Sequence, residues 1–202
     1  LLGTDLGPGR TRVSVISLVG LPATDSQQQF LAQLALALFT WIKKNPAPSG
    51  LPLRGLLVLD EARDFVPAAA PAACKAALIR LVSQARKYGL GLIFATQAPK
   101  SLENKVIVNC TTQVYGRANS PEAIRVVREQ IKQRGGSGED VPTLEKGRFY
   151  LYSETVNHER PAQPVKIAVP MCLTHHPPSP LDEAGVLRRA QASRAGMKGR
   201  GC

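Results

Sequence analysis

Two short apolar runs in this chain end in polar side chains that are able to do chemistry. Leu56–Leu59 is followed by the adjacent carboxylates Asp60 and Glu61, and residues 89–95 are followed by a threonine and then by Gln97. Short continuous apolar runs are typical of parallel strands buried on both faces. Because ligands bind beyond the carboxyl ends of the strands in open α/β sheets, we expect these polar residues to lie together at one sheet edge.

The functional groups of Asp60, Glu61 and Gln97 suit the transfer of a phosphoryl group from a nucleotide to water. This reaction needs a metal ion near the phosphates and a water molecule oriented for attack. An aspartate at a strand end binds the Mg²⁺ shell, the adjacent glutamate orients or deprotonates the water, and the amide contacts the terminal phosphate. A second interpretation stays open on the pattern alone: the first strand ends in solvated acids, and a turn follows the second.

Arg86 lies at the end of a predicted helix, just before the second apolar run. An arginine there is able to reach the nucleotide of a neighbouring subunit in a ring, where such a charge is worth about 10³ to 10⁵ in rate. The alternative is a cation at a helix C-terminus, which the helix dipole favours by less than about 1 kcal/mol. Spacing alone favours the second interpretation.

The elements that position these residues follow from hydrophobic periodicity and from turn residues. Strands alternate with helices over most of the length, which predicts a layered α/β fold with a mainly parallel sheet flanked by helices. Clusters of Pro, Gly and Ser separate the elements. We expect strands at about 12–18, 56–59, 91–96, 112–115, 147–152 and 165–169, and helices at about 24–44, 72–87, 120–133 and 181–195.

The charge balance indicates a polyanionic partner. Lys and Arg total 26 against 15 Asp and Glu, a net charge of +11. Nucleic acid is the usual partner of so basic a chain, and a solvated basic surface is the simpler alternative. The longest apolar stretch, residues 30–42, is too short for a membrane span of about 20 residues. The four cysteines are scattered without a Cys-x-x-Cys pair, which favours a reduced, cytoplasmic compartment.

Taken in order, these segments resemble the RecA-like motor ATPases of the HerA and FtsK superfamily, and HerA-type DNA translocases most closely. The matching segments are residues 15–21, 57–62, 84–99 and 109–119. The resemblance covers roughly residues 13–169, and the Asp-Glu, Arg-Lys-Tyr-Gly and Thr-Gln blocks in this order are fairly specific. It implies a partial RecA-like fold of the ASCE class of P-loop NTPases.

The resemblance also implies a role for each candidate residue. Asp60 matches the Mg²⁺-coordinating aspartate of the Walker B motif, and Glu61 matches its catalytic glutamate. Gln97 is similar to the phosphate sensor, and Arg117 to a further nucleotide-facing arginine. Arg86 matches the arginine offered in trans to the next subunit, which replaces the helix-end interpretation. The implied cofactors are ATP and Mg²⁺.

The implied assembly is a hexameric ring that threads double-stranded DNA as a translocase or helicase. HerA-type members of the family often work with a partner nuclease. We expect no membrane partner for this chain.

One motif of the family is missing from this sequence. The phosphate loop Gly-x-x-x-x-Gly-Lys-Ser/Thr occurs nowhere in the 202 residues. We therefore expect residues 1–176 to be the C-terminal portion of a RecA-like ATPase domain, and residues 177–202 a basic tail, partly helical or disordered. We expect this portion alone to be inactive, whereas the intact protein is an ATPase. The alternative is a catalytically inactive ring-forming or scaffold module derived from such an ATPase.

Overall fold

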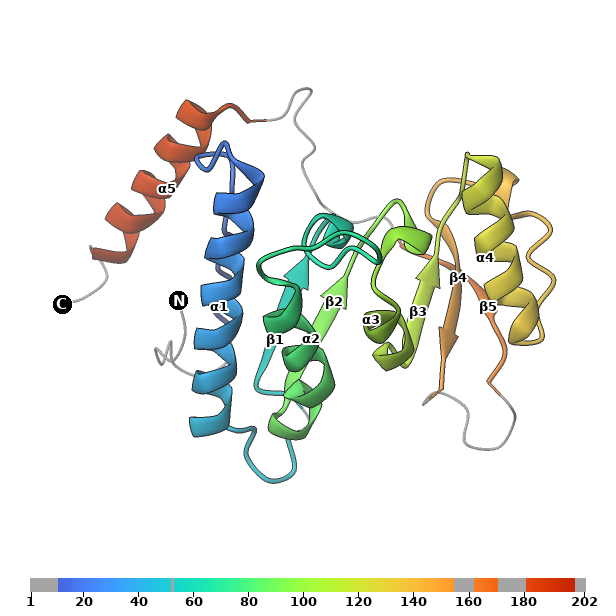
Figure 1. Cartoon of the computed structure of the whole chain (residues 1–202), viewed down its shortest axis with the longest axis horizontal. Coiled ribbons are helices and arrows are strands. Elements are labelled where there is room, and N and C mark those ends of the chain that lie inside the picture. The colour runs from blue at the N-terminus through green and yellow to red at the C-terminus, as the bar shows by residue number, and fades with distance from the viewer. Residues whose placement is uncertain (1–10, 52, 155–161, 171–180, 199–202) are drawn as a thin grey trace. The chain divides into compact units, whose positions relative to one another are not determined.

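The computed structural model describes residues 11–51, 53–154, 162–170 and 181–198. Contacts divide the chain into a larger unit, residues 28–173, and a smaller one formed by residues 1–27 and 174–202. The α-helices in Figure 1 are α1 Thr24–Lys44, α2 Lys75–Gln84, α3 Asn104–Asn109, α4 Pro121–Gln133 and α5 Glu183–Lys198. The strands are β1 Gly55–Leu59, β2 Leu90–Phe94, β3 Thr112–Tyr115, β4 Arg148–Ser153 and β5 Val165–Ala168. The short 3₁₀ turns are η1 Ala62–Asp64, η2 Ala85–Tyr88, η3 Pro99–Ser101 and η4 Val141–Thr143.

The two apolar runs form a parallel pair of neighbouring strands. The register places Gly55 of β1 opposite Leu90 of β2 and ends with Leu59 opposite Phe94. The other three strands form a separate antiparallel sheet in which β4 lies between β3 and β5. The predicted α/β class is therefore confirmed, and the observed parallel pairing is that of β1 with β2.

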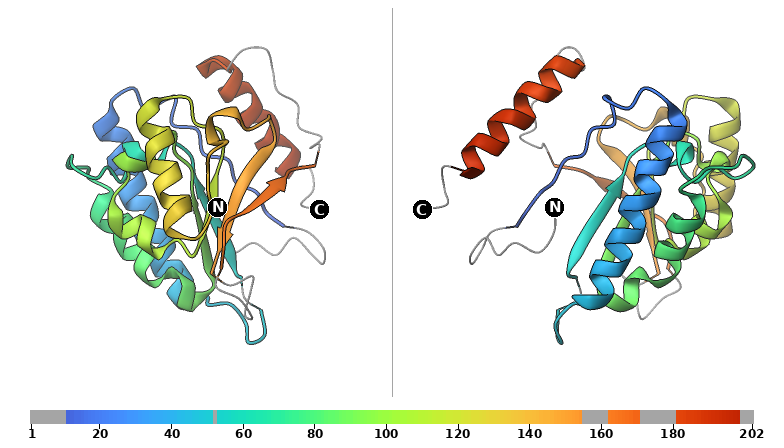
Figure 2. Two further views of the ribbon diagram at one scale, coloured as in Figure 1. Left: turned by 90° about the vertical axis from the view of Figure 1, so that its right-hand side faces the viewer. Right: turned by 60° about the vertical axis from the view of Figure 1, so that its left-hand side comes forward.

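Helices cover one face of the strands in the larger unit. The left view of Figure 2 shows α1, α2, α3 and α4 on the same side of the strands. α1 turns an apolar stripe inward at three- and four-residue spacing, the period of an amphipathic helix. Its buried residues are Leu31, Ala35, Leu38, Phe39 and Ile42.

The other face of the β1–β2 pair is open within the described part of the larger unit. Leu56 and Val58 of β1 are 54% and 58% exposed, and Ile93 of β2 is 48% exposed. The expectation that these runs are buried on both faces is therefore wrong for this structure. The physical reason is that the described helices of this unit pack against one face only.

A second small core joins α4 to the antiparallel sheet. It consists of Val127, Ile131, Val141, Leu144 and Tyr150. α4 begins as predicted, because the Ser120 hydroxyl accepts a hydrogen bond from the backbone N–H of Ala123 at 3.2 Å and Pro121 follows the cap.

Asp140 holds η4 against this antiparallel sheet. Its carboxylate accepts a hydrogen bond from the Tyr150 hydroxyl and pairs with Lys166 Nζ at 2.6 Å. The pKa of Asp140 is accordingly lowered, mainly by the bond from Lys166 and then by the bond from Tyr150.

The sequence predictions at the two ends of the chain had different outcomes. The strand predicted at about residues 12–18 is wrong, because this segment has no strand pairing and Val13 and Val15 are 82% and 90% exposed. β-branched residues favour strands through packing against neighbours, and that packing is missing here. The helix predicted near residues 181–195 is observed as α5, Glu183–Lys198. In the described residues no helix has the length and apolar character needed to cross a membrane.

Cys74, which precedes α2, offers a test of the packing beneath this helix. Its side chain is completely buried, its thiol donates a hydrogen bond to the carbonyl of Phe65 at 3.2 Å, and burial raises the pKa of the thiol to about 11. Since the thiolate is the reactive form, we expect Cys74 in the folded chain to resist iodoacetamide at pH 8. Denaturation in urea should make it react readily. Mass spectrometry of digested peptides measures both, and rapid labelling of the folded chain would contradict the burial.

Candidate functional site

The carboxyl ends of β1 and β2 are joined by backbone hydrogen bonds that continue the parallel pairing. The N–H of Ala95 donates to the carbonyl of Leu59 at 3.0 Å, and the N–H of Ala62 donates to the carbonyl of Ala95 at 2.8 Å. Asp60 and Glu61 lie between these two anchors and therefore beside the segment that leads to Gln97. The structure thus brings the three predicted residues to one edge of the parallel pair.

The backbone of Glu61 has a left-handed conformation, with φ 47° and ψ 48°. Among the described residues it is the one non-glycine with positive φ. An L-residue in this region costs about 1–2 kcal/mol, and such residues cluster at functional sites. The turn is held by a hydrogen bond from the Glu61 N–H to Asp60 Oδ1 at 2.9 Å and by the fully buried Ala62 that follows.

The two carboxylates lie in different surroundings. Asp60 is exposed. The Glu61 side chain is 29% exposed, and its Oε1 lies 3.0 Å from Nε of Arg63. That oxygen is buried but has no hydrogen bond of good geometry within the described residues. Arg63 therefore orients the Glu61 carboxylate by charge while leaving its hydrogen-bonding capacity unused.

Gln97 has an exposed side chain on the loop after β2. Within the described part of the chain, that side chain forms no hydrogen bond with either carboxylate. The neighbouring Thr96 closes the local turn, because its hydroxyl accepts a hydrogen bond from the N–H of Ala98 at 3.1 Å. Gln97 is therefore free of the turn and able to contact a ligand at this edge.

Arg86 lies at the opposite end of β2 from these residues. It is exposed in η2, which precedes β2, whereas Gln97 follows β2. Five residues of strand separate the two ends by about 16 Å. Arg86 is therefore not part of the same cluster as Asp60 and Glu61 within one chain.

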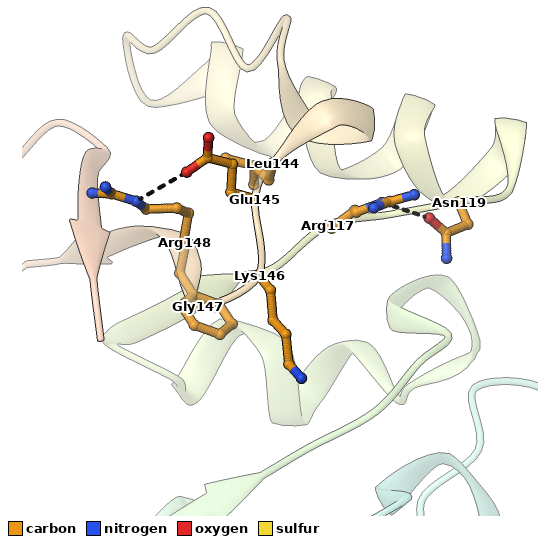
Figure 3. A pocket seen from close by; sticks show the side chains of 8 residues that line it. Arg117, Asn119, Leu144, Glu145, Lys146, Gly147 and Arg148 are labelled. Carbon is orange, nitrogen blue, oxygen red and sulfur yellow. Dashed lines mark hydrogen bonds and ion pairs between the residues drawn. The ribbon is translucent and has the colours of Figure 1, made fainter. Parts of the chain in front are cut away.

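Arg117 follows β3 and lines an open pocket of about 470 Å³ (Figure 3). Its Nε donates to Asn119 Oδ1 at 3.1 Å, and Figure 3 shows the two side chains together at one side of the pocket. Lys146, which precedes β4, and Arg148, the first residue of β4, also line the pocket. Arg148 pairs with Glu145 across 3.8 Å, so two of these three cations have a polar partner drawn in Figure 3.

Gly116 allows the two walls of this pocket to come together. A Cβ built at Gly116 would lie 3.2 Å from the Phe149 ring, closer than ordinary van der Waals contact. The β3–β4 register ends with Tyr115 opposite Tyr150, so Arg117 lies just beyond the end of the pairing. Together with Lys146 and Arg148, it gives the pocket three cations, which favour an anion.

Sequence reasoning missed Arg63, Lys146 and Arg148. Arg63 had a local signal, because it follows the Asp-Glu pair by two residues. The two cations before and at the start of β4 had none, since only the pairing of β3 with β4 brings them near Arg117.

The donor set fits a magnesium nucleotide better than a metal held by protein alone. No group of three or more His, Cys, Asp or Glu that could hold a metal ion occurs among the described residues. Mg²⁺ usually binds one or two protein carboxylates together with substrate phosphates and water. An exposed aspartate, a glutamate with a buried oxygen lacking a hydrogen bond, and a nearby amide match that requirement.

Comparisons with known proteins support the fold. No protein-family profile matches the chain, and no curated protein matches it. The genome packaging NTPase B204 from Sulfolobus turreted icosahedral virus 2, solved with sulfate, matches with a TM-score of 0.54 and 21% identity over 73% of this chain. B204 from Sulfolobus turreted icosahedral virus, described as the DNA-packaging ATPase, matches with a TM-score of 0.49 and 20% identity over 76% of this chain and 73% of its own.

The match to the sulfate-bound structure covers 64% of that packaging NTPase. B204 from Sulfolobus turreted icosahedral virus 2 has also been solved with ATP-gammaS, and that structure matches 65% of this chain and 58% of its own at 22% identity, with a TM-score of 0.47. The match to the sulfate-bound structure shows that the chain shares the α/β fold of a genome packaging NTPase and spans under two thirds of the length of that structure.

The strain at Glu61 predicts the effect of a glycine there. Glycine adopts positive φ without steric cost but loses more backbone entropy on folding, so we expect Glu61→Gly to be about 0.5–1 kcal/mol more stable than Glu61→Ala. Both variants remove the carboxylate and its ion pair with Arg63, so the comparison isolates the backbone. Urea unfolding followed by circular dichroism measures the difference, and equal stability of the two variants would show that this turn is unstrained.

Proposed function

We propose that this chain carries the Walker B, sensor and arginine-finger side of the active site of an ATP-driven double-stranded DNA translocase of the HerA and FtsK type, working in the cytoplasm as a hexameric ring. The observation that carries the proposal is the strained Glu61 turn at the carboxyl end of a parallel strand, directly after Asp60 and beside the segment leading to Gln97. The shared α/β fold with a packaging NTPase supports it.

Asp60 is the residue that would hold Mg²⁺, because it is exposed at the sheet edge. When bound, Mg²⁺ neutralises charge on the nucleotide phosphates. Glu61 differs from Asp60 in its left-handed backbone and its ion pair with Arg63, and we assign to its carboxylate the orientation of a water molecule and the acceptance of its proton. Arg63 restrains that carboxylate at 3.0 Å. Gln97 donates its amide N–H to a phosphate oxygen or to the same water.

We further propose that residues outside these 202 supply the phosphate loop, because the motif is not in this sequence. Backbone amides of such a loop bind the phosphates, and its lysine neutralises them. A partner nuclease is a further element of the proposal, as in the related HerA systems.

Replacement of Glu61 by glutamine tests the catalytic assignment in the protein that includes the loop. The amide keeps the size of the side chain but cannot accept a proton, so we expect ATP hydrolysis to fall by about 10²- to 10⁴-fold while nucleotide binding persists. Phosphate release and binding of a fluorescent ATP analogue are the two measurements. Glu129→Gln on the exposed face of α4 is the matched control and should be fully active. Undiminished turnover of Glu61→Gln would exclude the assigned role, and no nucleotide binding by the unaltered protein would favour an inactive scaffold module.

Mixing of two inactive variants tests the role of Arg86 in trans. Arg86→Ala removes the charge offered to the next subunit, and Glu61→Gln disables the subunit's own site, so each pure ring should be inactive. In mixed rings, some sites combine an intact Glu61 with an intact Arg86 from the neighbour, and we expect hydrolysis to return there. A finger in trans is worth about 10³ to 10⁵ in rate, so the recovery is measurable by phosphate release. Full activity of Arg86→Ala rings would refute the finger, as would mixtures that stay inactive.

A further inference from the structure

A cluster of exposed cations lies at the end of the β1–β2 pair opposite the carboxylates. Lys43 and Lys44 are in the last turn of α1, Arg54 precedes β1, Arg80 is on α2 and Lys87 is in η2. These five residues, called the basic surface below, are all exposed. Lys43, Lys44 and Arg80 also line an open pocket of about 390 Å³ with Leu36, Phe39 and Thr40.

The basic surface has no acidic residues in the segments that form it. Residues 28–59 and 65–102 contain neither aspartate nor glutamate. None of the five cations forms an ion pair within the described residues. Other cations there do form ion pairs, among them Lys75, Lys100, Lys166 and several arginines. Five uncompensated positive charges repel one another, and an anionic ligand relieves that repulsion.

Aromatic rings hold these cations in place. Lys43 and Arg80 lie over the ring of Phe39, at 5.6 Å and 5.2 Å from its centroid. The Tyr88 ring packs edge-on against the Phe39 ring, with 6.3 Å between their centroids. Lys87 Nζ lies 5.1 Å from the centroid of the Tyr88 ring. Cation–π contacts of this kind position a charge without neutralising it.

The backbone ties the three parts of the surface together. The N–H of Ala47 donates to the carbonyl of Tyr88 at 3.0 Å, and the N–H of Arg54 donates to the carbonyl of Gly89 at 2.6 Å. A Cβ at Gly89, where φ is +78°, would lie 2.4 Å from the Cβ of Ala47, so only glycine permits this close approach. Arg54 itself lies 5.8 Å from the centroid of the Trp41 ring. The end of α1, the loop that follows it and η2 therefore form one fixed junction.

We propose that the basic surface binds the phosphate backbone of duplex DNA. Its location favours a polyanion, because the five-residue strands separate Arg54 and Lys87 by about 16 Å from the Asp60 and Glu61 carboxylates, which repel phosphates. Its chemistry is that of phosphate contact, since the five groups are lysines and arginines and the neighbouring Asn45 amide already donates to the carbonyl of Trp41. Phosphate contacts carry no sequence information, so we expect binding to be independent of base sequence. The identity of the partner as DNA rests on the proposed function, whereas the existence of the surface does not.

The test is binding of the full chain to a fluorescently labelled 30-base-pair duplex, measured by anisotropy over a series of salt concentrations and without nucleotide. We expect the triple variant Lys43→Ala, Lys44→Ala, Arg80→Ala to bind roughly tenfold or more weakly. The slope of log affinity against log salt should fall by about one for each lost phosphate contact. The control triple variant Lys105→Ala, Lys132→Ala, Arg189→Ala makes the same change in net charge at exposed positions elsewhere and should bind within about twofold of the unaltered chain.

Three results would overturn the proposal. The first is unchanged affinity of the basic-surface variant, and the second is an equal loss in the control, which would mean that net charge alone determines binding. The third is binding to vesicles of anionic phospholipid with no binding to DNA, which would assign the surface to a membrane. Because no nucleotide is present, a failure of the hydrolysis tests at Glu61 leaves this result unaffected. Circular dichroism of both triple variants confirms that they are folded.

Discussion

The parallel pairing of β1 with β2 is the constraint on which the rest of the larger unit depends. Parallel strands bring all their carboxyl ends to one edge and all their amino ends to the other. Here the carboxyl edge receives Asp60, Glu61 and the segment leading to Gln97, whereas the amino edge receives Arg54 and η2. One short ladder of hydrogen bonds thus separates an acidic end from a basic end.

The strained turn at Glu61 depends on the same ladder. A glutamate keeps a left-handed backbone only where the surrounding structure holds it in that conformation. The hydrogen bonds from Ala95 to Leu59 and from Ala62 to Ala95 hold Glu61 in this way, because they fix the chain on both sides of the turn. Ala62, which follows the turn, is fully buried. The left-handed backbone of Glu61 is therefore a consequence of strand pairing and not of residue type.

Local sequence patterns predicted those parts of the fold that depend on local physics. The helices α1 and α4 and the two short apolar strands lie close to their predicted ranges, because each depends on spacing and side-chain chemistry within a few residues. The segment at residues 12–18 mixes β-branched and polar residues, a pattern that also favours a strand, yet it has no strand pairing. The wrong prediction for this segment shows that a strand also requires a neighbouring strand to pair with. A local sequence pattern does not reveal whether such a neighbour is present.

The candidate site likewise has features that the sequence predicts and features that it does not. That Asp60, Glu61 and Gln97 share an edge was predictable, because parallel pairing follows from two similar apolar runs. The left-handed backbone at Glu61 was not predictable, since residues other than glycine rarely adopt positive φ. The junction of Phe39, Tyr88 and Lys87 was also unpredictable, because it joins residues about fifty positions apart through ring contacts.

The position of η2 offers a physical route by which hydrolysis and DNA contact would be linked. Arg86 and Lys87 are adjacent in this turn; the first is proposed to reach the nucleotide of the next subunit, and the second belongs to the basic surface. Gly89, with its left-handed backbone, and the bonds from Ala47 and Arg54 make the turn part of a close-packed junction. Packed elements move as units and do not deform continuously. On the proposed function, a shift of Arg86 as the neighbour's phosphate leaves would carry Lys87 and the end of α1 with it, so that the same turn would respond to the nucleotide and move a DNA contact.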